Sequence, residues 1–126
     1  MKSYVLSIFA ITIILISCSD NVELKELDVI KYPWLKPFVM ETNNFSGHHN
    51  IDLGTMNFKY KYDGTYDKIR DRFNSVIVEN NWTVLSKGDK FWEIEKPLEL
   101  YNGQYQVTYI KIEIDSLNRQ AIFEIK

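Results

Sequence analysis

The stretch TMNFKYKYDGTYDKIRDRFNSVIVE, residues 55–79, switches from one hydrophobic period to another. In its first part, apolar side chains alternate with polar ones, at Met56, Phe58, Tyr60 and Tyr62. In its second part, apolar side chains recur every three or four residues, at Tyr66, Ile69, Phe73, Val76 and Ile77. The first period is typical of a half-buried strand. The second is typical of an amphipathic helix, expected at about residues 65–79 with Thr65 as its cap.

Downstream of the helix, short alternating runs predict antiparallel strands. They cover residues 82–85, 90–100, 104–115 and 120–126, with turns between them. Asn102-Gly103 favours a two-residue type I′ hairpin, which would set Tyr101 opposite Gln104. Pro97 lacks a ladder donor, so its strand is expected to lie at an edge or to break there. The predicted order β-α-β-β-β-β gives an α+β fold, in which an antiparallel β-sheet of about four to five strands carries one amphipathic helix packed on one face.

Two changes of phase mark the predicted strands. Ile51 and Leu53 are out of phase with the strand that follows them, and Gly54 stands where a β-bulge would. Within residues 104–115 the phase changes near Tyr109, which a bulge or burial of both faces would explain. The face opposite the helix is predicted to be a wet, mixed-charge surface formed by Lys59, Lys61, Glu93, Glu95, Lys111, Glu113 and Glu124.

The chain begins with a positive start and a short apolar run that ends in a cysteine. Lys2 precedes the run Val5 to Ile16, and Leu15-Ile16-Ser17-Cys18 closes it. Twelve helical residues span roughly 18 Å, which is too short for the ~30 Å hydrocarbon core of a bilayer. A processed leader is therefore favoured over a permanent transmembrane helix.

The leader resembles the signal peptide of bacterial lipoproteins, and residues 15–18 resemble its lipobox. The resemblance implies that the thiol of Cys18 takes a diacylglyceryl group, that cleavage falls just before it, and that the new amine is acylated. It also implies an anchor in the cell envelope. The periplasmic face of an outer membrane is favoured where the cell has two membranes, because Ser19 is not the Asp of inner-membrane retention. The resemblance covers residues 1–18 and implies nothing about the rest of the chain.

The expected organisation is a signal peptide at 1–17, a lipidated tether with a Pro/aromatic segment at 18–50, and a single small α+β domain at 51–126. Two or three acyl chains on Cys18 would hold the tether to the membrane essentially permanently. Residues 41–50 are polar and rich in Asn and His, which predicts a loop ahead of the domain.

The Pro/aromatic segment, residues 32–40, combines bulky apolar side chains with two prolines that prevent a continuous helix. One interpretation is that it wraps the domain and covers an open face of the core. Another is an exposed epitope for a protein partner, whose candidate residues are Tyr32, Trp34, Leu35 and Phe38. A third is contact with the membrane interface, which Trp and Tyr favour.

The sequence contains none of the residue constellations that carry catalysis, so no enzymatic activity and no cofactor are expected. His48 and His49 are the only histidines. Neighbours in an extended chain point apart, so no metal site is expected there. With 15 basic and 17 acidic side chains and a formal net charge of −2, the chain has no electrostatic footprint for nucleic acid.

The leading functional hypothesis is a membrane-anchored envelope lipoprotein whose small domain binds another protein as a non-enzymatic accessory module. One alternative is an immunity or inhibitor lipoprotein that neutralises an exported toxin or hydrolase, because its acidic surface suits a basic partner. Another is a small-ligand-binding lipoprotein, in which the eight tyrosines and three tryptophans line a pocket instead of the core.

Overall fold

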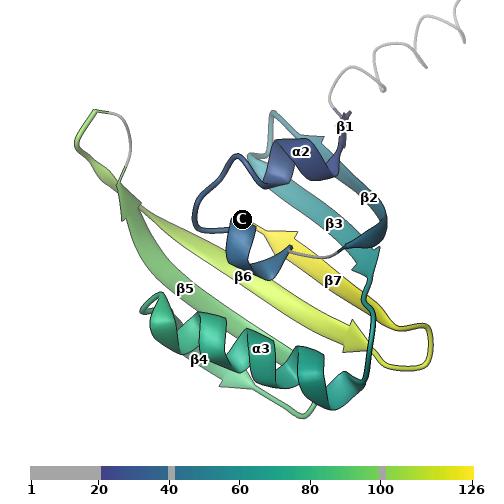
Figure 1. Cartoon of the computed structure of the whole chain (residues 1–126). Coiled ribbons are helices and arrows are strands. Elements are labelled where there is room, and N and C mark those ends of the chain that lie inside the picture. Colours follow the sequence, from purple (N-terminus) through teal and green to yellow (C-terminus); the bar gives the residue numbers. More distant parts are fainter. Residues whose placement is uncertain (1–20, 40–41, 100–101) are drawn as a thin grey trace, which may run out of the picture.

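The computed structural model describes residues 21–39, 42–99 and 102–126, which form a seven-stranded antiparallel sheet (Figure 1). The strand order across the sheet is β1-β2-β3-β7-β6-β5-β4, and the long helix α3 packs on one face. The elements in chain order are β1 (Asn21–Leu24), α2 (Glu26–Val29), the 3₁₀ helix η1 (Lys36–Phe38), β2 (Asn43–Asn50), β3 (Thr55–Lys61), α3 (Tyr66–Glu79), β4 (Thr83–Lys87), β5 (Phe91–Glu99), β6 (Tyr105–Asp115) and β7 (Gln120–Ile125).

The antiparallel sheet with one amphipathic helix confirms the predicted class, but the prediction of four to five strands is wrong. The two further strands, β1 and β2, come from residues that were predicted to be tether and loop. Strand β2 carries a single apolar residue, Phe45, among its eight, so no alternating pattern marks it. It forms because its backbone pairs with β1 on one side and β3 on the other. Within the described residues the sheet therefore begins at Asn21, well before the predicted domain boundary at Ile51.

The connection β3–α3–β4 sets the plan of the sheet. Strands β3 and β4 point the same way, because β7, β6 and β5 lie between them and every neighbouring pair is antiparallel. Helix α3 therefore crosses the sheet from β3 to the far edge (Figure 1). The chain then returns strand by strand through β4, β5 and β6 until β7 pairs with β3.

Helix α3 forms where the 3.6-residue period predicted it. The Thr65 hydroxyl accepts a hydrogen bond from the backbone N–H of Lys68 at 3.3 Å, which satisfies one of the free donors of the first turn. Its buried face consists of Ile69, Phe73, Val76 and Ile77. Asn80 ends the helix, and Asn81 takes the left-handed conformation with φ of 61°.

Phe38 joins the helix to the sheet. Its ring is fully buried and lies 5.8 Å from the ring of Phe73 on α3, 5.9 Å from Phe123 on β7 and 6.4 Å from Trp82. The buried hydroxyl of Tyr60 on β3 donates a hydrogen bond to the Phe38 carbonyl. Phe38 thus contacts two layers of the fold, and its backbone is tied to the sheet.

The rest of the Pro/aromatic segment packs beside α3 on the same face of the sheet. Leu35 and Val39 are buried in the core cluster, and Arg72 of α3 donates a hydrogen bond from Nη2 to the Pro37 carbonyl at 3.2 Å. The interpretation that this segment covers an open face of the core is therefore confirmed. Together, α3 and residues 32–39 form the second layer of the fold (Figure 1).

Three local predictions differ from the structure. Residues 51–54 form the turn between β2 and β3, with Gly54 at φ of 65°, instead of a bulged strand. Strand β6 pairs with β5 and with β7 without a shift of register, and its residues before Ile110 are exposed or half-buried, so neither a bulge nor two-sided burial explains its change of phase. In the hairpin between β5 and β6, Glu99 lies opposite Tyr105. The predicted two-residue turn would instead set Glu99 opposite Gln106. The expected pair of Tyr101 and Gln104 itself lies partly outside the described residues.

Removing the Phe38 ring should cost more than removing any exposed leucine. We expect Phe38→Ala to lower the free energy of unfolding by about 3–5 kcal/mol, because it leaves a cavity between α3 and the sheet. Chemical denaturation measures the change. Leu117→Ala is the control, since that side chain is 91% exposed and its loss should cost under about 0.5 kcal/mol. Equal effects of the two substitutions would contradict the packing described above.

Tyr60 should make the fold sensitive to high pH. Burial raises the pKa of Tyr60 above its ordinary value of 10.0, because the phenolate is poorly solvated in the core. Its contribution to stability is complete below pH 10 and is lost as the pH rises above that value, where the unfolded chain ionises first. We expect Tyr60→Phe to flatten the fall of the melting temperature above about pH 10. Identical slopes for the two proteins would contradict this assignment.

Candidate functional site

The predicted contact residues of the Pro/aromatic segment divide into two pairs. Leu35 and Phe38 are fully buried, so their assignment to a partner-binding epitope is wrong: they belong to the core. Tyr32 is exposed, and Trp34 is partly buried against the core. Cys18, the candidate lipidation site, lies outside the described residues.

Tyr32 and Trp34 continue into a line of aromatic contacts that reaches β5. The rings of Tyr32 and Trp34 are 5.5 Å apart, and those of Trp34 and Trp82 are 6.3 Å apart. Lys96 Nζ lies 4.9 Å from the centre of the Trp82 ring and donates a hydrogen bond to the Asn80 carbonyl at 2.8 Å. Burial lowers the pKa of Lys96. Most of this line packs against the core, so it presents little free surface.

The outer half of the hairpin between β5 and β6 extends beyond the strands on either side of it. Strand β4 pairs with β5 no further than Glu95, and β7 pairs with β6 only from Ile110 onward. Among the described residues, 96–99 and 105–108 pair only with each other, and we call them the arm. Figure 1 shows the arm projecting from the sheet at the upper left. Pro97 lies in it, beyond the end of β4, so the prediction that its strand is at an edge there is confirmed.

One face of the arm carries apolar side chains in water. Tyr105 is 69% exposed and Val107 is 59% exposed. They stand opposite Glu99 and Pro97, and we call these four residues the arm patch. Among the described residues no ion pair involves Glu99 or the neighbouring Glu95. A two-stranded ribbon is marginally stable in water, so these exposed apolar groups are not explained by the arm's own packing.

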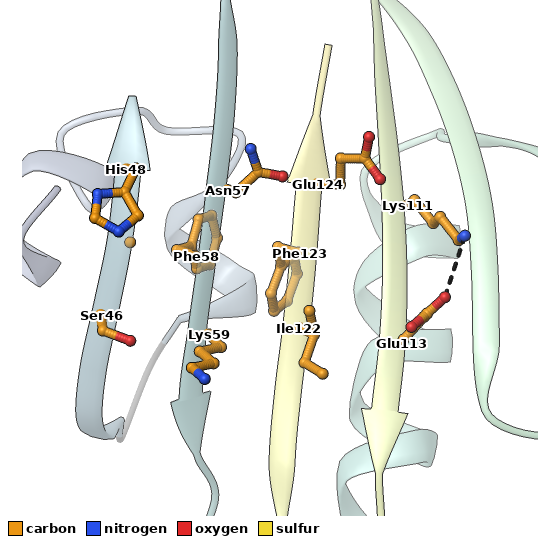
Figure 2. A pocket seen from close by; sticks show the side chains of 11 residues that line it. Ser46, His48, Asn57, Phe58, Lys59, Lys111, Glu113, Ile122, Phe123 and Glu124 are labelled. Atoms are coloured by element: carbon orange, nitrogen blue, oxygen red, sulfur yellow. Dashed lines mark ion pairs between the residues drawn. The ribbon is translucent and has the colours of Figure 1, made fainter. Parts of the chain in front are cut away.

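A second candidate is a hollow of about 360 Å³ on the sheet face opposite α3 (Figure 2). The side chains around it come from four strands: Ser46 and His48, Asn57 and Lys59, Ile122 and Glu124, and Lys111 and Glu113. Lys111 Nζ pairs with Glu113 Oε1 at 3.1 Å. The mixed-charge surface predicted for this face is therefore confirmed, and its donors and acceptors suit a small polar molecule.

The hollow is not the aromatic pocket of the small-ligand hypothesis. The rings of Phe58 and Phe123, which lie beneath it, are buried in the core. Trp92 and Tyr60 are also among the most buried side chains in the described part of the chain. The aromatic residues of the sheet thus serve mainly packing, which an isolated sequence pattern does not distinguish from a binding face.

The two histidines lie in β2, where a loop was predicted. His48 lines the hollow on the outer face, and His49 lines a separate hollow beside Val22, Asp28 and Tyr32. The two imidazoles therefore point apart, as neighbours in a strand must. Within residues 21–39, 42–99 and 102–126, no group of three or more His, Cys, Asp or Glu side chains converges to hold a metal ion.

The arm patch was not predicted from the sequence, although the sequence contains a signal for it. The change of phase near Tyr109 separates two parts of β6. The apolar residues after it, from Ile110 onward, lie on the core face, and those before it, Tyr105 and Val107, lie on the outer face. The ends of β4 and β7 decide that this part of β6 stands free, and those ends depend on register.

Comparison with known proteins gives no relative from which to assign a function. No protein-family model, curated protein or solved structure matches the chain. In the part of the chain that the structure describes, no helix has the length and hydropathy needed to cross a membrane. The candidate sites thus stand on their own geometry.

Proposed function

We propose that the protein is a lipid-anchored envelope protein that binds another protein through the arm patch, without an enzymatic activity of its own. The observation that supports this most is the exposure of Tyr105 and Val107 on a ribbon that no further strand flanks in the described part of the chain. Covering these side chains removes apolar surface from water, at about 25 cal/mol for each Å². The lipobox resemblance at residues 15–18 supplies the anchor.

The form of the arm favours a protein over a small molecule. No strand in the described part of the chain pairs with the outer edges of its two strands, so backbone N–H and C=O groups there can pair with an added strand. Strand addition gives affinity through the main chain, and side chains on the exposed face give specificity. The arm patch thus offers both parts of a protein contact at one place.

The charge of the patch indicates the kind of partner. Glu95 and Glu99 stand on the same face as Tyr105 and Val107, and neither is in an ion pair among the described residues. A partner with a basic and apolar surface would complement them. Such a partner fits an accessory subunit of an envelope assembly. It also fits the alternative, an exported basic toxin or hydrolase that this protein would neutralise.

The anchor is tested by removing its thiol. We expect Cys18→Ser to abolish labelling with radioactive fatty acid and to release the protein from the membrane fraction. The physical reason is that the thioether-linked chains supply nearly all of the membrane affinity. Cell fractionation with immunoblotting measures retention. A variant that remains in the membrane fraction would mean that the leader acts as a helical anchor.

The partner contact is tested by photo-crosslinking in the native envelope. A photoreactive amino acid replaces Val107 in one protein and Leu117 in a control, since both side chains are exposed but lie at opposite ends of β6. We expect one discrete protein adduct from position 107 and none from position 117. Tyr105→Asp in the same chain should abolish the adduct while leaving the melting temperature unchanged, because Tyr105 is exposed.

Two outcomes of this experiment would contradict the proposal. One is the absence of any adduct from position 107 in protein that is folded and acylated. The other is an adduct that survives Tyr105→Asp unchanged. Either result would favour the alternative that the protein binds a small ligand, with the polar hollow of Figure 2 as its candidate site.

A further inference from the structure

The turn between β2 and β3 presents two large apolar side chains to solvent. Ile51 is 59% exposed and Leu53 is 73% exposed. The turn is held in shape, because the Asn50 side chain accepts a hydrogen bond from the Leu53 N–H at 3.0 Å. Around Gly54 there is open space: an added Cβ would meet nothing within 4 Å. The two side chains therefore project from a fixed turn that the described part of the chain does not cover.

This turn lies beside the point where the chain enters the sheet. Asn21, the first residue of β1, pairs with Asn50, which directly precedes the turn. Figure 1 shows the start of β1 and the turn between β2 and β3 at the same end of the molecule. Asn21 is three positions after Cys18 in the sequence, with two residues between them. Even fully extended, three residues reach no more than about 11 Å, so an acyl anchor on Cys18 would hold this end of the sheet against the bilayer.

We propose that Ile51 and Leu53 rest in the interface of the lipid bilayer and give the anchored domain a fixed orientation. The occupant of this surface is a membrane, and the inference rests on the proposed acylation of Cys18. The turn contains no basic residue, and Asp52 stands between the two apolar side chains. The contact is thus apolar and shallow, at the level of the headgroups, and does not require anionic lipid.

A single exposed leucine is common on protein surfaces and needs no explanation. Leu117, in the turn between β6 and β7, is such a residue, and it is 91% exposed at the opposite end of the strands. The β2–β3 turn differs in two respects. It presents two apolar side chains in one turn, and the pairing of Asn21 with Asn50 places this turn beside the strand that begins three positions after the proposed anchor.

The experiment uses the acylated full-length protein in vesicles. Because Cys18 is the only cysteine and would be acylated, Leu53→Cys and Leu117→Cys each introduce one free thiol for an environment-sensitive fluorophore. The proteins are reconstituted in vesicles of phosphatidylethanolamine and phosphatidylglycerol with spin-labelled lipid. We expect a blue shift and strong quenching for the label at position 53, and neither for the label at position 117. Replacing phosphatidylglycerol by phosphatidylcholine should leave the result unchanged.

The outcomes separate this inference from the anchor on which it rests. Mass spectrometry first establishes whether Cys18 is acylated; an unmodified Cys18 would overturn both. Acylated protein with no quenching at position 53, or with equal quenching at both positions, would overturn the membrane contact while the anchor stands. A photo-crosslink from position 53 to a protein in native envelopes would then assign the turn to a protein surface instead.

Discussion

The fold depends on the insertion of Phe38 between α3 and the sheet. Helix α3 crosses the sheet from β3 to β4, and the space beside it is filled by the Pro/aromatic segment. Phe38 contacts the helix, β7 and Trp82 at once, and its carbonyl accepts a hydrogen bond from the buried Tyr60. Residues 21–39 are thereby part of the domain, and the sheet, as far as the structure describes it, begins at Asn21, three positions after Cys18. The proposed acylation of Cys18 would therefore leave the domain little freedom to move away from the membrane.

An element could be predicted from the sequence where the burial of one face produces a regular spacing of its apolar residues. Helix α3 and strands β3 and β7 each bury one face, so their apolar residues recur at 3.6 or 2 residues and their positions were predictable. Strand β2 buries almost none of its side chains, and its formation depends on backbone pairing with distant residues. Propensity and periodicity carry no information about such pairing, so β2 was missed, and the apolar residues around β1 were compatible with a helical turn as well as with a short strand.

The candidate sites show the same division. Leu35 and Phe38 are apolar whether they pack or bind, and only the position of α3 decides that they are buried. The arm exists because β4 and β7 stop short of the ends of β5 and β6, which is a property of strand register. The arm leaves the sheet at the end where β1 begins and the β2–β3 turn lies, since Ile110 is opposite Ile125 and Ile125 is opposite Met56. The partner proposed for the arm would therefore meet it near the end of the domain at which the lipid anchor is proposed.

The central claim of this account is that another protein covers the arm patch in the envelope. Hydroxyl-radical footprinting tests it directly, because the oxidation of Tyr105 reports solvent access at that side chain. The reactivity of Tyr105 is compared between intact envelopes and the purified acylated protein, with exposed Leu117 as the internal reference. The account predicts that Tyr105 is protected in the envelope while Leu117 reacts equally in both. Equal oxidation of Tyr105 in the two preparations would contradict it.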